Sequence, residues 1–95
     1  MKDRKTYIPF TDGTVYDIET HSFRMVTLYE LLDRIAECEK YCRWNARMLE
    51  SAMDYEDDTQ IPSCLDSMVY FGEQASICLE LINKGLYTEV NPYAV

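Results

Sequence analysis

The chain has 95 residues, a net charge of −8 and a hydrophobic fraction of 47%, which is typical of a small folded domain rather than a disordered segment. We therefore treat residues 1–95 as a single domain. The acidic balance disfavours direct binding to nucleic acid, because the phosphate backbone carries the same sign of charge. No apolar run approaches the roughly 20 residues of a membrane span, and no signal-peptide pattern opens the chain. We expect a cytoplasmic protein that does not enter the membrane.

Residues 5–20 predict a short β-hairpin. Asp12-Gly13 is a turn signal, and residues that suit strands flank it on both sides. These are Tyr7, Ile8, Phe10, Val15, Tyr16 and Ile18. Because a lone hairpin is barely stable, it must pack on the rest of the domain.

A helix is predicted from about residue 28 to about residue 54. Thr27 and Glu30 have the spacing of a capping box, in which each side chain binds the backbone N–H of the other residue. Val26 and Leu31 occupy the two positions of a hydrophobic staple. Beyond them, apolar residues recur at heptad-like spacing as far as Met53, which favours one continuous helix.

A second helix is predicted over about residues 63–84. Ser63 follows Pro62 and can cap the start, and Gly85 behind Lys84 is a typical helix stop. Residues 87–95 contain Pro92 and are predicted to form an irregular tail.

The apolar stripes of the two helices fit one antiparallel register, with the turn inside the polar loop. The matched pairs are Leu31 with Leu86, Ile35 with Ile82, Cys38 with Leu79, Cys42 with Ala75, Leu49 with Met68 and Ala52 with Leu65. The fold class is therefore mainly α: residues 27–86 form an antiparallel helical hairpin, preceded by the short N-terminal β-hairpin.

Two helices alone cannot cover all the apolar residues of this hairpin. Each helix carries a second stripe: Tyr41, Trp44, Met48 and Tyr55 on the first, and Tyr70, Ile77 and Leu81 on the second. Either the N-terminal hairpin covers these side chains or another subunit does. We expect a homo-oligomer that completes a helical bundle.

The four cysteines do not have the spacing of a disulfide framework or of a zinc site. Cys38 and Cys42 are one helical turn apart, whereas Cys64 and Cys78 are about 21 Å apart along a helix. His21 is the only histidine, so a four-ligand zinc site is not formed either. We expect free, buried thiols, and neither a metal nor a cofactor.

The first candidate site is an acidic run at the loop between the helices. It comprises Glu50, Asp54, Glu56, Asp57 and Asp58, followed by Asp66. Acidic groups at a helix C-terminus are unfavourable, at about 0.3–1 kcal/mol each, so the run does not help the helix. It is either a solvated loop that improves solubility or a surface for a basic partner protein. A calcium loop fits poorly, because Thr59 stands at the required glycine and Leu65 at the closing glutamate.

The second candidate site is a basic and aromatic cluster on the first helix, which could hold the phosphate and stack the base of a small nucleotide. It comprises Lys40, Tyr41, Arg43, Trp44 and Arg47. The alternative is a set of ion pairs between the helices. In the predicted register Glu73 lies close to Arg43, within an acidic stripe formed by Asp66, Glu73 and Glu80.

Catalytic patterns are missing from the sequence. It has no Ser/His/Asp set, no cluster of metal ligands and no Gly-rich phosphate loop, and His21 is expected in a solvated linker between hairpin and helix. We therefore predict a protein that is not an enzyme and acts stoichiometrically by binding. Its expected target is a basic, nucleic-acid-binding protein surface; the alternative is an oligomeric binder of a small anionic ligand such as a nucleotide signal.

In size and charge the chain resembles the small anti-defence proteins of phages, including anti-CRISPR proteins. The residues that carry the resemblance are Glu50, Asp54, Glu56, Asp57, Asp58 and Asp66. It implies an inhibitor that covers or imitates a nucleic-acid surface on a host protein. Through Arg43, Trp44 and Arg47 the chain also resembles phage sponge proteins, which sequester nucleotide signals with oligomeric helical hairpins. Both are resemblances at the level of class.

Overall fold

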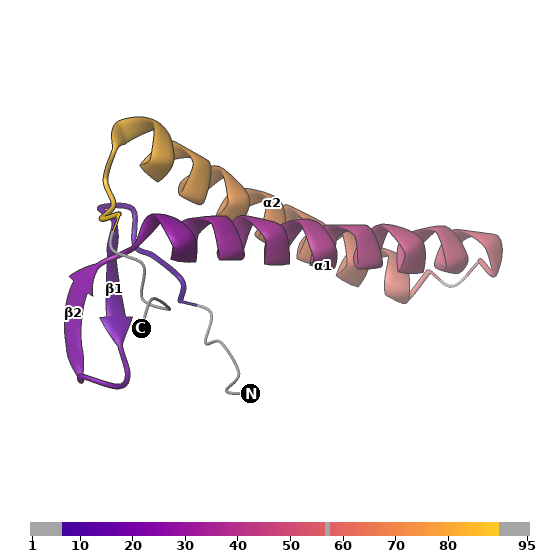
Figure 1. Cartoon of the computed structure of the whole chain (residues 1–95). Helices are drawn as coiled ribbons and strands as arrows, with labels where there is room; N and C mark the ends of the chain where they lie inside the picture. The colour runs from indigo at the N-terminus through magenta and orange to yellow at the C-terminus, as the bar shows by residue number, and fades with distance from the viewer. Residues whose placement is uncertain (1–6, 57, 90–95) are drawn as a thin grey trace, which may run out of the picture.

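Two long antiparallel helices form an arm, and a β-hairpin lies at one end of it, as Figure 1 shows. The computed structural model describes residues 7–56 and 58–89. Its elements are β1 (Thr14–Asp17), β2 (Ser22–Met25), α1 (Leu28–Asp54) and α2 (Gln60–Lys84). The predicted mainly helical class is thus confirmed, with its helical hairpin and its N-terminal β-hairpin.

Helix α1 begins and ends where the sequence predicts. The Thr27 hydroxyl accepts a hydrogen bond from the backbone N–H of Glu30 at 3.1 Å, and the Glu30 carboxylate accepts one from the N–H of Thr27 at 3.0 Å. This capping box satisfies two of the backbone donors that a helix start leaves without partners.

Helix α2 begins at Gln60, three residues before the predicted start at Ser63. Pro62 therefore lies inside the first turn of the helix, where its missing N–H needs no partner. The end is as predicted: Gly85 has a φ of 70°, and Leu86 donates its N–H to the carbonyl of Leu81 at 3.0 Å. This is a Schellman motif.

The β-hairpin exists, but the predicted range of 5–20 is wrong, because the turn at Asp12-Gly13 precedes the first strand and does not connect the two strands. The strands pair from Thr14 with Met25 to Asp17 with Ser22, so the connecting loop is residues 18–21. Asp12 instead accepts hydrogen bonds from the N–H and hydroxyl of Thr14, which makes an earlier, separate turn. His21, expected in the linker, is an exposed residue of the hairpin loop.

The base of the arm, where the hairpin meets the helices, is joined by backbone contacts. Gly13 packs so closely on the chain that follows α2 that an added Cβ would lie 2.6 Å from the carbonyl oxygen of Leu86. The N–H of Thr88 donates to the carbonyl oxygen of Val26, and the carbonyl oxygen of Thr88 accepts a hydrogen bond from the N–H of Leu28. These two bonds form an isolated parallel β-bridge between Thr27 and Thr88. The start of the predicted irregular tail is therefore ordered; residues 90–95 lie outside the described residues.

The hydrophobic core also lies at this base. Its fully buried members come from the hairpin, from both helices and from the residue that precedes the cap of α1. They are Val15, Val26, Leu31, Cys78 and Leu81, with Ile35 and Ile82 packed against them. The hairpin therefore covers the Ile77–Leu81 part of the second apolar stripe.

Along the rest of the arm, the residues of α2 that face α1 differ by one position from the prediction. Cys64 and Cys78 are buried, whereas the predicted Leu65 and Leu79 are about half exposed. Neighbouring residues of a helix point 100° apart, so choosing the wrong one of two adjacent apolar residues turns the seam. The smaller cysteine side chains lie between the helices and allow a close approach.

Candidate functional site

The arm has two broad faces, because residues on either side of the helix–helix seam point to opposite sides of the pair. One face carries a row of four stacked or tilted rings, which we call the aromatic face: Trp44, Tyr41, Phe71 and Tyr70. The Tyr41 ring lies 6.3 Å from that of Trp44 and 5.1 Å from that of Phe71, and Phe71 lies 5.1 Å from Tyr70. The row crosses from α1 to α2 and helps to fix their register.

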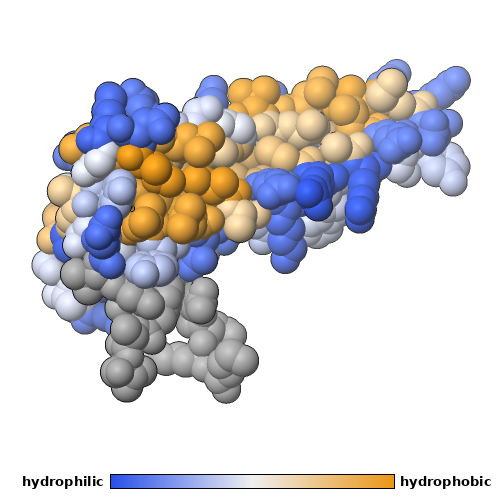
Figure 2. Space-filling view, turned by 45° about the horizontal axis from the view of Figure 1, so that its top comes forward, coloured by the Kyte–Doolittle hydropathy of each residue, from blue (hydrophilic) through white to orange (hydrophobic). Residues whose placement is uncertain are grey.

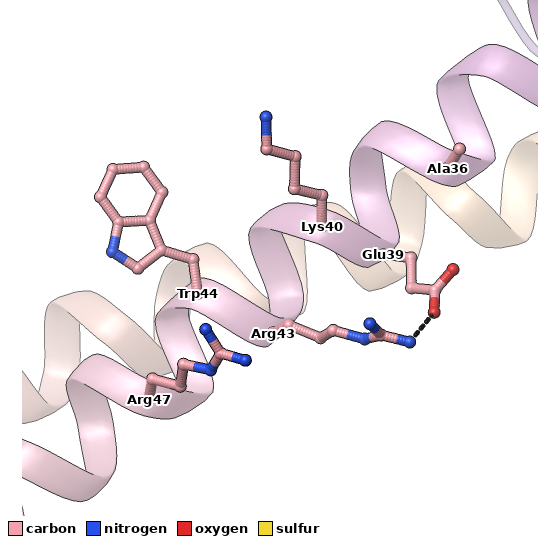
Figure 3. A pocket seen from close by; sticks show the side chains of 6 residues that line it. All are labelled: Ala36, Glu39, Lys40, Arg43, Trp44 and Arg47. Atoms are coloured by element: carbon pink, nitrogen blue, oxygen red, sulfur yellow. Dashed lines mark hydrogen bonds and ion pairs between the residues drawn. The ribbon is translucent and has the colours of Figure 1, made fainter.

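The predicted basic cluster lies on α1 beside this row. An open depression of about 610 Å³ runs along the helix there, as Figure 3 shows, and is lined by Ala36, Glu39, Lys40, Arg43, Trp44 and Arg47. Four of the five predicted ligand-site residues line it, while Tyr41 turns toward Phe71. The Trp44 ring is 57% exposed, so its face is accessible to a planar ligand.

The predicted ion pair between Arg43 and Glu73 does not form. Arg43 binds Glu39 of its own helix, at 2.6 Å, and its side chain is 73% exposed. Arg43 points away from α2, because it lies more than a quarter-turn of the helix from the seam residue Cys38. The ion pairs Arg34–Glu37, Arg43–Glu39 and Lys84–Glu80 each lie within a single helix, and the depression beside Arg43 is lined by residues of α1.

The acidic candidates lie at the far end of the arm. We call Glu50, Asp54, Glu56 and Asp58 the acidic tip; all four are exposed. Asp57 lies outside the described residues. Asp66 is exposed as well, but it lies in the second turn of α2 rather than in the loop. The last turn of α1 contains no basic residue to offset these charges.

Arg24 is the centre of a charged cluster that has a structural role and that no motif in the sequence indicates. Arg24 of β2 donates to Asp17 at 2.8 Å and, through two nitrogens, to both oxygens of Glu30 at 2.8 and 2.7 Å. The hydrogen bond from Arg24 lowers the pKa of Asp17 to about 2. Burial raises the pKa of Glu30, but the hydrogen bonds from Arg24 and Thr27 outweigh it and leave the pKa lowered. Both carboxylates stay charged, which suits a clamp between hairpin and helix.

The four cysteines are free thiols that lie largely inside the fold. All four are free; Cys38, Cys64 and Cys78 are buried and Cys42 is half-buried. Burial raises the pKa of the Cys78 thiol to about 11, so it is protonated at neutral pH. In the part of the chain that the structure describes, no three metal-ligating side chains come together.

No family model, curated protein or solved structure matches this chain. Over the described residues, neither helix has the length and apolar character needed to cross a membrane. Candidate functions therefore rest on the surfaces of the arm.

Proposed function

We propose that this protein is a non-catalytic, stoichiometric inhibitor or adaptor of the anti-defence type, which docks on a basic, nucleic-acid-binding protein surface. The observation that carries the proposal is the acidic tip at the end of the arm. Its four carboxylates are exposed, and within the described residues none of them has a basic partner. A concentrated field of this kind accelerates association with a surface of opposite charge.

The shape of the molecule supports this proposal. The Cα radius of gyration is 16.0 Å, against about 12 Å for a compact chain of this length. The arm therefore extends the acidic tip well away from the hydrophobic core, so the tip can enter a groove without disturbing the fold. The tip is also placed where acidic groups disfavour the helix, at the C-terminal end of α1. A role in binding explains a charge that stability does not.

Neutralising the tip tests the proposal. The variant Asp54→Asn with Asp58→Asn removes two charges from the tip, and the matched control Glu80→Gln with Glu89→Gln removes two exposed charges from the opposite end. Proteins retained by the wild-type chain from a lysate of its source cell are identified, and their association rates are measured at several salt concentrations. We expect the tip variant to associate at least about tenfold more slowly at low salt, and the control to behave like wild type. Equal rates for both variants would contradict the proposal.

A second candidate function is the binding of a small anionic ligand with an aromatic ring, such as a nucleotide, in the depression on α1. It is favoured by Lys40, Arg43 and Arg47 beside the exposed Trp44, with no acidic residue of α2 reaching them. Thermal shift with mono-, di- and cyclic nucleotides tests it, because a ligand at about 100 times its Kd adds about 2.7 kcal/mol to the free energy of unfolding. No shift with any of them, and no change in Trp44 fluorescence, would remove this candidate.

A further inference from the structure

The face of the arm opposite the aromatic face carries exposed apolar side chains from both helices. We call it the open face. It is formed by Leu32 and Met53 of α1 and by Leu65, Val69 and Leu79 of α2, all between 46% and 62% exposed. Four of these residues directly follow a buried seam residue, and Val69 lies one helical turn after Leu65, which places all five on the same side of the pair. Figure 2 shows apolar surface running along this side of the arm.

Nothing in the chain's described fold covers the open face. The β-hairpin packs on the other side, because its core contacts include Leu81, which lies on the same stripe of α2 as Tyr70. Small residues form the middle of the open face. A Cβ added to Gly72 would have no atom within 4 Å, and Ser76, one turn further along α2, is exposed. Another helix can therefore approach α2 closely here.

Unpaired charges border the open face on its two long edges. Lys40 and Arg47 lie on the outer side of α1, and Asp66 and Glu73 lie on the outer side of α2; all four are exposed. Among the described residues, none of the four takes part in an ion pair. The two cations are seven residues apart, and so are the two anions. A basic edge thus runs along one side of the face and an acidic edge of the same spacing along the other.

We propose that a second copy of this chain docks on the open face, related by a two-fold axis parallel to the arm. Helix α1 of each copy then lies antiparallel on α2 of the other, and the four helices form a bundle. Within the hairpin itself, the Tyr41 ring lies beside that of Phe71, and the Cys42 thiol lies 3.9 Å from the carbonyl oxygen of Met68. In that register, Lys40 comes close to Glu73 of the second copy and Arg47 close to Asp66 of the second copy. By symmetry each pair forms twice.

The charges along the two edges of the open face favour this arrangement over the other way of stacking the same two faces. A two-fold axis perpendicular to the arm would place α1 on α1 and α2 on α2. The basic edges would then face each other, and so would the acidic edges, which is repulsive. The axis parallel to the arm is the one that brings opposite charges together on both sides.

The face is also large enough for a stable dimer. Helices of 25 and 27 residues give an arm about 38 Å long, and two helices side by side are about 20 Å wide. The footprint is roughly 750 Å² for each copy, close to the roughly 800 Å² that a standard interface buries on each partner. The interface lies on the side of the arm opposite the β-hairpin, so the aromatic face and the acidic tip would stay accessible.

The oligomeric mass of the purified protein tests the proposal directly, because no other partner is needed. We expect sedimentation equilibrium of the full chain, from about 1 µM to about 500 µM, to show a monomer–dimer equilibrium. Val69→Glu places a charge in the middle of the interface and should raise the Kd at least about tenfold, whereas Tyr55→Glu, at an 83% exposed position off the open face, should leave it unchanged. A wild-type monomer at about 500 µM, or a dimer unaffected by Val69→Glu, would overturn the proposal.

Charge reversal tests the direction of the two-fold axis. Arg47→Glu and Asp66→Arg should each weaken the homodimer, because each creates two like-charge contacts. Mixing the two variants should restore the dimer, since both contacts in the mixed pair are again between opposite charges. If the mixture stays monomeric, or if Arg47→Glu alone strengthens association as the perpendicular axis requires, the proposed arrangement is wrong. Circular dichroism of each variant confirms that the helices are intact. The outcome is independent of whether the acidic tip captures a partner.

Discussion

The guanidinium group of Arg24 binds both carboxylate oxygens of Glu30, at 2.8 and 2.7 Å, and so ties the β-hairpin to the first turn of α1. Glu30 is simultaneously the reciprocal member of the capping box, so one buried carboxylate serves both the helix start and the attachment of the hairpin. This arrangement carries the first two predictions.

Replacing Arg24 should destabilise the fold. In Arg24→Ala, the Glu30 carboxylate loses its cation while 4% exposed, and we expect the free energy of unfolding to fall by roughly 1–3 kcal/mol. The matched control is Arg43→Ala, which removes an exposed ion pair with Glu39 and should change stability by less than about 0.5 kcal/mol. Urea unfolding followed by circular dichroism measures both. Similar losses in the two variants would show that the Arg24 contacts are no stronger than surface pairs.

Stability should decrease in acid because of the same contacts. The pKa values of Asp17 and Glu30 are lower in the folded protein than in the unfolded chain, and that of Asp17 falls to about 2. The unfolded chain therefore takes up protons first, so the stabilisation is complete above about pH 5 and is lost as the pH falls toward about 2. Melting temperatures measured from pH 7 to pH 2 should show this decline. In Arg24→Ala the decline should be shallower, and a curve parallel to that of wild type would argue against the assignment.

The glycines should respond in opposite ways to substitution by alanine. At Gly13, with a φ of 89°, an added Cβ would meet the Leu86 carbonyl, so Gly13→Ala should lower the free energy of unfolding by at least about 1–2 kcal/mol. At Gly72, inside α2 with open space around it, alanine should raise that energy by about 0.5–1 kcal/mol. Urea unfolding at low protein concentration compares the two. A stable Gly13→Ala would mean that the hairpin can move away from α2.

Thiol reactivity should separate Cys42 from the other cysteines. Cys42 is half-buried, whereas the remaining three are buried and the pKa values of Cys38 and Cys78 are raised by burial. With a chromogenic disulfide reagent we expect one thiol per chain to react quickly and three to react only on unfolding. Cys42→Ser should remove the fast phase. Rapid reaction of any thiol in that variant would contradict the packing between the helices.

The sequence is most informative where local chemistry decides the structure. The capping box at Thr27 and the Gly85 stop are set by residues within one turn, and they locate α1 and the end of α2 correctly. The Asp12-Gly13 pair is a true turn, but its glycine is required by the close approach of Leu86, which is more than 70 residues away. No local pattern reveals such a contact.

The candidate sites show the same division. The exposure of the acidic tip follows from composition and from its place between two helices, and the clustering of Lys40, Arg43 and Trp44 follows from helical spacing. The predicted Arg43–Glu73 pair fails because it needs the rotation of each helix about its own axis. That rotation depends on whether Cys78 or Leu79 enters the seam, and both are apolar. The contacts of Arg24 with Asp17 and Glu30 depend on the register of the β-hairpin and on how the hairpin packs on α1. The spacing of these three residues in the sequence therefore does not predict the contacts.

The backbone bridge between Thr27 and Thr88 makes the base of the arm more stable against local unfolding than its other end. At the base, hydrogen bonds bind the beginning of α1 to the chain that follows α2, so neither terminus can unwind separately. At the other end, the last turn of α1 and the first turn of α2 are held by few buried side chains. Local opening should therefore begin in these two turns and travel inward, with amide exchange slowest near Leu31 and Leu81. The region that would meet a partner first is the one that can adjust its backbone while the core stays closed.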